Sequence, residues 1–215
     1  MKLIVTRPQH DITTKYLSSW AGEIIDFAKK KGIEICDLSK EKANKSEFEG
    51  RVEKLNPEIV FLNGHGDDGN VAGHDNIELV NVNKNYKILN NKITYALSCN
   101  SAKVLGAKVA EEKTAAYIGY SDEFIFICDS KYVSKPLADP KAKPFMASSN
   151  QVMISLLKGN TAKDASEKSK NKFNDYFISL ASSNADPDSL QSAQFLWWDM
   201  RHQSCLGDVN AKLES

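Results

Sequence analysis

The sequence has no excess of either charge sign and no long apolar run. It contains 28 lysine and arginine residues against 28 aspartate and glutamate residues, so it lacks the positive surplus that gives nucleic-acid binding its affinity. No segment approaches the roughly 18 apolar residues of a membrane span, and the apolar stretch within residues 1–8 is too short for a signal peptide. We therefore expect a cytoplasmic protein that binds neither nucleic acid nor a membrane.

Cysteine is also scarce, and its spacing indicates neither metal binding nor disulfides. The four cysteines lie far apart, with no Cys-x-x-Cys pair: Cys36, Cys99, Cys128 and Cys205. Such spacing suits neither a zinc site nor a dense disulfide framework. Dinucleotide and phosphate-loop motifs are absent as well, because the glycines between residues 64 and 69 have the wrong spacing and precede a turn-rich stretch. We expect reduced thiols, no metal and no cofactor.

What the sequence does contain is an alternation of strand and helix patterns. Short apolar runs predict strands at residues 3–6, 33–38, 59–65, 93–99 and 115–120, with 124–128 as a further candidate. Helical spacing of apolar residues covers 13–31, 45–55 and 102–111, and residues 69–79 suggest a small hairpin. The alternation implies an α/β fold, with a mainly parallel sheet of about six strands flanked by helices on both faces.

The composition shows no break strong enough to divide the chain into two domains. We interpret residues 1–215 as one domain, in which 1–130 form the α/β core and 131–215 a mostly helical C-terminal part packed on it. Helices are predicted at 145–157 and 162–180, separated by Gly159 and Asn160. Residues 195–200 are predicted to be a terminal strand or a short helix.

Two of the predicted strands end on residues with nucleophilic or acid–base chemistry. One apolar run leads to His65 and another to Cys99, 34 residues later. If these strands are neighbours in a parallel sheet, both side chains emerge at its carboxyl edge, where open α/β sheets bind ligands. An imidazole beside a thiol supports cysteine nucleophilic catalysis, and the amides of Gly66 and Cys99 would form an oxyanion hole.

This arrangement resembles the caspase-like cysteine peptidases of clan CD, in particular the gingipain-like and CHAT-type branches. The resemblance is carried by a strand ending in His65-Gly66, a strand ending in Ser98-Cys99, and the order histidine before cysteine. Further agreement comes from a following strand ending in Tyr120, the Gly159-Asn160-Thr161 step and a terminal Gly207-Asp208. It implies a caspase-hemoglobinase fold and a cysteine endopeptidase with a Cys99 nucleophile and a His65 general acid or base. The Gln-Ala-Cys-x-Gly motif of caspases is absent, so their aspartate specificity is not implied.

The sequence defines the substrate preference less clearly than the catalytic residues. Asp122 and Glu123 follow a predicted strand, where a carboxylate could pair with a basic residue of a protein or peptide substrate. Arg7 and Asp11, beyond the first strand, are further candidates at the edge of the site, and Arg7 would instead suit an acidic substrate. The sequence leaves both alternatives open, and it does not indicate the oligomeric state.

Several other interpretations remain open on the sequence alone. Cys99 could be a buried structural thiol, since free cysteine is among the most buried residue types. His74 is the rival histidine, although its glycine-rich surroundings favour a solvated loop, and His10 and His202 are interpreted as structural. The main alternative function is a catalytically idle or latent caspase-like domain that acts as a protein- or ligand-binding module.

Overall fold

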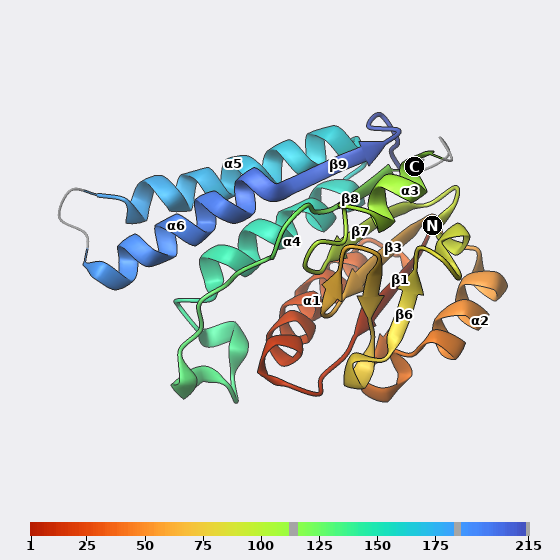
Figure 1. Cartoon of the computed structure of the whole chain (residues 1–215), viewed down its shortest axis with the longest axis horizontal. Coiled ribbons are helices and arrows are strands. Elements are labelled where there is room, and N and C mark those ends of the chain that lie inside the picture. Colours follow the sequence, from red (N-terminus) through yellow and green to blue (C-terminus); the bar gives the residue numbers. More distant parts are fainter. Residues whose placement is uncertain (112–115, 183–185, 214–215) are drawn as a thin grey trace.

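The computed structural model describes residues 1–111, 116–182 and 186–213, and its central element is a six-stranded sheet (Figure 1). In spatial order the strands are β2 (Glu34–Ser39), β1 (Lys2–Arg7), β3 (Ile59–Asn63), β7 (Ile93–Leu97), β8 (Ala116–Tyr120) and β9 (Gln203–Gly207). The first five run parallel, and β9 is antiparallel to β8. The predicted α/β class with a mainly parallel sheet is therefore confirmed. Residue 115, predicted to begin the fifth strand, lies outside the described residues.

Helices connect most of these strands. They are α1 (Ile12–Lys30), α2 (Lys45–Leu55), α3 (Leu105–Glu111), α4 (Lys143–Leu157), α5 (Ala162–Leu180) and α6 (Pro187–His202). Short 3-10 helices are η1 (Lys40–Lys42), η2 (His74–Asn76), η3 (Tyr86–Leu89), η4 (Ser130–Tyr132) and η5 (Pro136–Ala138). Helix α1 begins where Asp11 caps it by accepting a hydrogen bond from the Thr14 amide. Its N-terminus thereby lies directly beyond the carboxyl end of β1.

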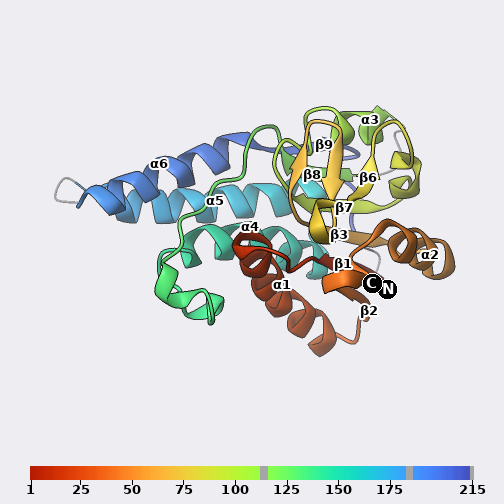
Figure 2. The same cartoon turned by 60° about the horizontal axis from the view of Figure 1, so that its bottom comes forward.

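The alternation of side chains along the strands divides the core between the two faces of the sheet. Leu3 and Val5 of β1 belong to one apolar cluster, with residues of α1 and α4. Ile4, between them, belongs to a second cluster, with residues of α2, α3 and a small second sheet. Successive side chains of a strand point to opposite faces, and both faces of the sheet are covered, so every apolar residue of β1 is buried. Figure 2 shows the elements on the two faces of the sheet from a second direction.

The second sheet lies between β3 and β7 in the sequence. Its strands β4 (Gly66–Asp67), β5 (Asn70–Ala72) and β6 (Glu78–Asn81) are antiparallel. Strands β5 and β6 form the hairpin predicted at residues 69–79, and β4 extends it to a three-stranded sheet that begins with the residue after His65. Val71, Leu79 and Val80 anchor it in the second apolar cluster, so the chain just past His65 is held against the body of the protein.

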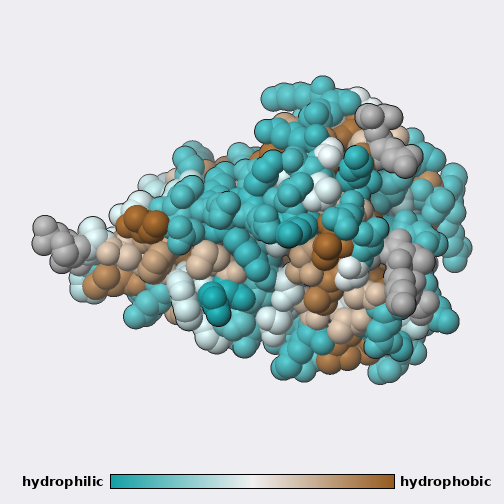
Figure 3. Space-filling model, turned by 90° about the horizontal axis from the view of Figure 1, so that it is seen from above, coloured by the Kyte–Doolittle hydropathy of each residue, from teal (hydrophilic) through white to brown (hydrophobic). Residues whose placement is uncertain are grey.

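The C-terminal part adds a helical layer and the last strand. Phe145, Phe173 and Leu196 join α4, α5 and α6 in a separate apolar cluster, and β9 completes the sheet. Helices α5 and α6 extend beyond the sheet (Figure 1), and apolar side chains are exposed along this extension (Figure 3). No helix in the described part of the chain combines the length and apolar character of a membrane span.

Three local predictions differ from the structure. Residues 195–200 lie inside the long helix α6, because its N-cap Asp186 and Pro187 start a helix that continues to His202. The candidate strand at 124–128 is not a strand: the Ile125 amide donates to the Asp199 side chain instead of to a neighbouring strand. Helix α3 begins at Leu105 rather than at residue 102.

Candidate active site

The register between two strands brings His65 and Cys99 to the same edge of the sheet. Strands β3 and β7 are parallel neighbours, and Asn63 is paired with Leu97. His65 and Cys99 each follow the paired residue by two positions. The Gly64 amide still donates to the Leu97 carbonyl, at 3.4 Å, so the two chains separate only at this point. The predicted adjacency of the two strand ends is confirmed.

Glycine allows the two strand-end loops to approach this closely. A Cβ atom added to Gly66 would lie 2.2 Å from the Ser98 hydroxyl oxygen and 3.1 Å from the Cys99 carbonyl oxygen. An added Cβ on Gly64 would lie 2.2 Å from the Ala72 carbonyl oxygen. Real Cβ atoms do not tolerate such distances, so only glycine fits at these positions. The Gly66 backbone therefore runs directly beside that of Cys99, as the predicted oxyanion hole requires.

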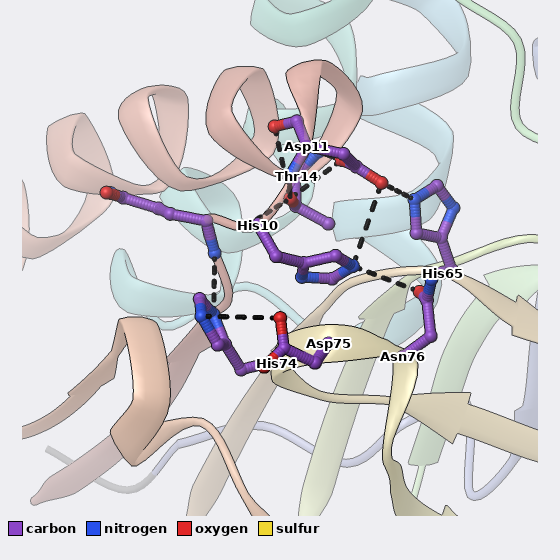
Figure 4. Close-up of polar contacts among 8 residues, drawn as sticks. His10, Asp11, Thr14, His65, His74, Asp75 and Asn76 are labelled. Carbon is purple, nitrogen blue, oxygen red and sulfur yellow. Dashed lines mark hydrogen bonds and ion pairs between the residues drawn. The ribbon is translucent and has the colours of Figure 1, made fainter.

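His65 has a carboxylate partner that the sequence did not reveal as such. Its Nε2 lies 2.6 Å from Oδ2 of Asp11, while Oδ1 of Asp11 accepts from the Thr14 amide at 2.7 Å (Figure 4). Burial opposes ionisation of Asp11, but the hydrogen bonds from Thr14 and His65 outweigh it, and the pKa of Asp11 lies below its usual value. Asp11 was predicted as a substrate-binding residue at the edge of the site; in the structure its carboxylate contacts the His65 imidazole. Its capping pattern, Asp-x-x-Thr after a strand, is the signal that locates it.

Cys99 is covered rather than open. Its Sγ lies 3.8 Å from the Phe124 carbonyl oxygen, and in the described conformation it shares no hydrogen bond with His65. Burial raises the pKa of the Cys99 thiol, and the negative charges of Glu123 and Asp199 raise it further. The thiol is therefore protonated at neutral pH in this conformation.

The segment that covers Cys99, residues 122–128, is fastened at three points. The Asp122 carbonyl accepts from the Asn100 amide at 2.9 Å. The Glu123 carbonyl accepts from the Trp198 indole at 3.0 Å, and the Ile125 amide donates to Asp199 at 3.0 Å. Two of the three contacts come from α6, so this helix holds the segment over the thiol.

Asp199 is a functional candidate that the sequence analysis missed. Its side chain is fully buried, and Oδ2 has no hydrogen-bond partner among the described residues. Burial raises the pKa of Asp199 well above its usual value, while the hydrogen bond from the Ile125 amide opposes the shift. In the sequence, the only feature that pointed to Asp199 was an acidic residue between Trp198 and Met200 in an apolar stretch.

The remaining predicted substrate residues differ in their surroundings. The Arg7 guanidinium is bound to the Asp37 carboxylate and donates to the Ser18 carbonyl at 3.2 Å, so it serves the fold around β1, β2 and α1. Asp122 is partly exposed, and Glu123 is exposed, on the segment that covers Cys99. The structure thus brings His65, Cys99, Gly66 and Asp11 together, with Asp122 and Glu123 nearby and Arg7 engaged elsewhere.

The interpretation of His74 needs correction. The His74 side chain is only 13% exposed, because its Nδ1 accepts from the Gln9 amide and its ring lies 5.3 Å from that of His10. It is therefore not a solvated loop histidine. His10, interpreted as structural, lies with its ring centroid 6.0 Å from that of His65, whereas the Nδ1 of His202 contacts the Trp198 carbonyl on α6.

The ring positions also create a potential metal-binding group. His10, Asp11 and His65 each offer a ligand atom within 4.8 Å of the others. No ligand spacing in the sequence predicts this group, because 54 residues separate Asp11 from His65.

Comparison with known proteins adds no family assignment. No protein-family model matches the chain, and no curated protein matches it. The function must therefore be argued from the site itself.

Proposed function

We propose that the chain is a cysteine endopeptidase with a caspase-hemoglobinase-like fold, in which Cys99 is the nucleophile and His65 the general acid and base. The observation that carries the proposal is the register of β3 and β7, which places both residues two positions beyond paired residues. The strand order and the small sheet inserted between His65 and Cys99 are compatible with the fold that the resemblance implies.

Asp11 and His65 support the proton transfers of this reaction. With Nε2–H donating to Asp11, Nδ1 of His65 is the nitrogen left to take the thiol proton as Cys99 attacks the substrate carbonyl carbon. The imidazolium, stabilised by the Asp11 carboxylate, then protonates the amine while the C–N bond breaks. Water hydrolyses the thioester and regenerates the thiol. The amides of Gly66 and Cys99 stabilise the oxyanion in both steps.

The described conformation corresponds to a resting form of the enzyme. A thiolate is the nucleophile, yet burial under residues 122–128 keeps Cys99 protonated. The segment is held by hydrogen bonds from Asn100, Trp198 and Asp199 and by packing of Phe124, Phe126 and Ile127 against the apolar clusters. Each hydrogen bond contributes about 1 kcal/mol, and a bound substrate has to offset both these bonds and the apolar packing to displace the segment.

Negative charge around Cys99 supports a basic residue before the scissile bond. Glu123, exposed on the segment that covers Cys99, is acidic, and its charge raises the pKa of the thiol. Arg7, the residue that suited an acidic substrate, is already neutralised by Asp37. A lysine or arginine side chain entering beside Cys99 would find a carboxylate partner, whereas an aspartate would be repelled.

Acyloxymethyl ketone probes test the proposal directly. The purified chain is treated with arginyl, lysyl and aspartyl probes, and the modified residue is located by mass spectrometry. We expect modification of Cys99, fastest with the basic probes. His65→Ala should slow it about 10²- to 10⁴-fold, the usual contribution of a general acid–base group. Cys205→Ala, which removes another partly buried thiol, is the matched control and should label like the unmodified chain.

Two results would contradict the proposal. Labelling of Cys99 at the same rate in His65→Ala would show an ordinary thiol with no catalytic partner. Absence of labelling by every probe in a folded sample would instead favour the binding-module alternative. Circular dichroism of each variant establishes that it is folded.

A further inference from the structure

Imidazole groups are concentrated beside His65. The chain has four histidines, and three of them lie in one group: the His10 ring is 6.0 Å from that of His65 and 5.3 Å from that of His74. They come from three separate segments, after β1, after β3 and in η2. Figure 4 shows the His10 and His65 side chains directed toward the Asp11 carboxylate, which lies between them.

The donor atoms of this group are close enough to share one ion. Oδ2 of Asp11 is 2.6 Å from Nε2 of His65 and 3.7 Å from Nε2 of His10. The Asn76 side-chain oxygen lies 3.1 Å from the same His10 nitrogen. Tetrahedral zinc sites have bonds of about 2.0–2.2 Å, which place ligand atoms about 3.3–3.6 Å apart. The donor atoms of His10, Asp11 and His65 all lie within 4.8 Å of one another, so shifts of about 1 Å bring them to the spacing of zinc ligands.

The ligands are held in place independently of any ion. Asp11 is the N-cap of α1, and Thr14 occupies its Oδ1, which leaves Oδ2 as the free coordinating oxygen. The His10 side chain is only 10% exposed, and its backbone amide is bound to the Thr14 hydroxyl at 3.1 Å. Such outer-shell contacts orient metal ligands and raise metal affinity.

We propose that His10, Asp11 and His65, with Asn76 as a fourth ligand, form a binding site for a divalent transition-metal ion of the Zn²⁺ type. Two imidazoles and one carboxylate suit Zn²⁺ rather than Mg²⁺ or Ca²⁺, which prefer oxygen ligands. When the ion binds Nε2 of His65, the proton that this nitrogen donates to Asp11 moves to Nδ1 by exchange with solvent, so the ring stays neutral. The ion then lies between the ring and the carboxylate, where the proton was.

The consequence for activity rests on the proposed function. With Nε2 of His65 bound to the ion, the neutral ring carries its single proton on Nδ1. That nitrogen can then no longer accept the thiol proton of Cys99, and Asp11 no longer stabilises an imidazolium. The ion is thus a reversible inhibitor of the peptidase, acting through the histidine and without contact to the thiol.

Metal binding is measured without reference to activity. The chelator-treated full chain is titrated with Zn²⁺ by calorimetry and with Co²⁺ by visible absorption. We expect one ion per chain and an affinity at least about tenfold lower in His10→Asn and in Asp11→Asn, because each removes a ligand or its charge. Asparagine caps a helix as well as aspartate does, so Asp11→Asn keeps α1 intact. His202→Asn, a histidine outside the group, is the matched control.

The location of the ion is decided by two variants. Undiminished binding in Cys99→Ala, together with weaker binding in His10→Asn, supports the proposed site. Binding that is lost in Cys99→Ala would place the ion on the thiol and overturn the proposal. Lack of saturable binding, or equal affinity in His10→Asn and the unmodified chain, would overturn it as well.

A second readout separates this proposal from the proposed function. The rate of Cys99 labelling by the basic probe is measured with and without Zn²⁺. We expect the ion to slow labelling in the unmodified chain and to have a weaker effect in His10→Asn at the same concentration. Zn²⁺ binding with no effect on labelling would refute the inhibition. Zn²⁺ binding in a chain whose Cys99 never labels would refute the peptidase and leave the metal site established.

Discussion

Substitution of Gly66 by alanine tests whether the two strand-end loops are as closely apposed as the site requires. The added methyl group would lie 2.2 Å from the Ser98 hydroxyl oxygen, 2.7 Å from the Asn70 carbonyl oxygen and 3.1 Å from the Cys99 carbonyl oxygen. Rotation of the Ser98 side chain relieves only the first contact. The other two are with backbone, so β4 must move away from β5 or from the loop that carries Cys99.

Overpacking of this kind costs about 1–3 kcal/mol of the free energy of unfolding. A displacement of about 1 Å at reacting groups lowers rates by about 10²-fold, so labelling of Cys99 should fall by a comparable factor. Urea unfolding followed by tryptophan fluorescence gives the first quantity, and the basic acyloxymethyl ketone gives the second. Gly50→Ala is the matched control, because nothing lies within 4 Å of an added Cβ there. In helix α2 it should stabilise the chain by about 0.5–1 kcal/mol.

A double variant tests which contacts cause the expected losses of stability and of labelling rate in Gly66→Ala. The Ser98 hydroxyl is buried and has no hydrogen-bond partner among the described residues, so Ser98→Ala by itself should change stability little. Combined with Gly66→Ala, it should recover part of the lost stability but not the labelling rate, since the backbone contacts persist. A Gly66→Ala chain with unchanged stability and unchanged labelling would refute the apposition of the two loops.

Two further predictions concern α6. Because burial raises the pKa of Asp199, the folded chain binds its proton more tightly than the unfolded chain, and stability is lost as pH rises above about 4 toward the folded pKa. Asp199→Asn should remove this loss, which amounts to about 1.4 kcal/mol for each pH unit between the unfolded and folded pKa values. In urea unfolding, the stability of Asp199→Asn relative to the unmodified chain should therefore be higher at pH 7.5 than at pH 4.5, and an equal difference at the two pH values would contradict the prediction. Trp198→Phe removes the hydrogen bond to the Glu123 carbonyl and should speed alkylation of Cys99 by iodoacetamide about two- to tenfold, corresponding to about 0.5–1.5 kcal/mol, with an unchanged rate arguing against a fastening role.

The local pattern of the sequence was sufficient for the elements that carry the site. Strands such as Ile59–Asn63 and Ile93–Leu97 are buried on both faces, so they appear as continuous apolar runs bounded by polar residues. Their chain positions alone placed His65 and Cys99 at strand ends. The alternation of such runs with helical periodicity gave the α/β class. The prediction failed for 124–128, where apolar residues pack beneath α6 instead of pairing with a strand.

The sequence by itself therefore determined the strands β1, β2, β3, β7 and β8 and the positions of His65 and Cys99 just beyond β3 and β7, because these depend on near neighbours along the chain. It did not reveal β9. The tertiary structure alone decided the partners of those residues. Asp11 meets His65 across 54 positions, and Ile125 meets Asp199 across 74. His10 and His74 reach the site only because β1 lies beside β3 and the small sheet folds back over its edge. Contacts of this kind depend on strand order and register, which periodicity along the chain does not encode.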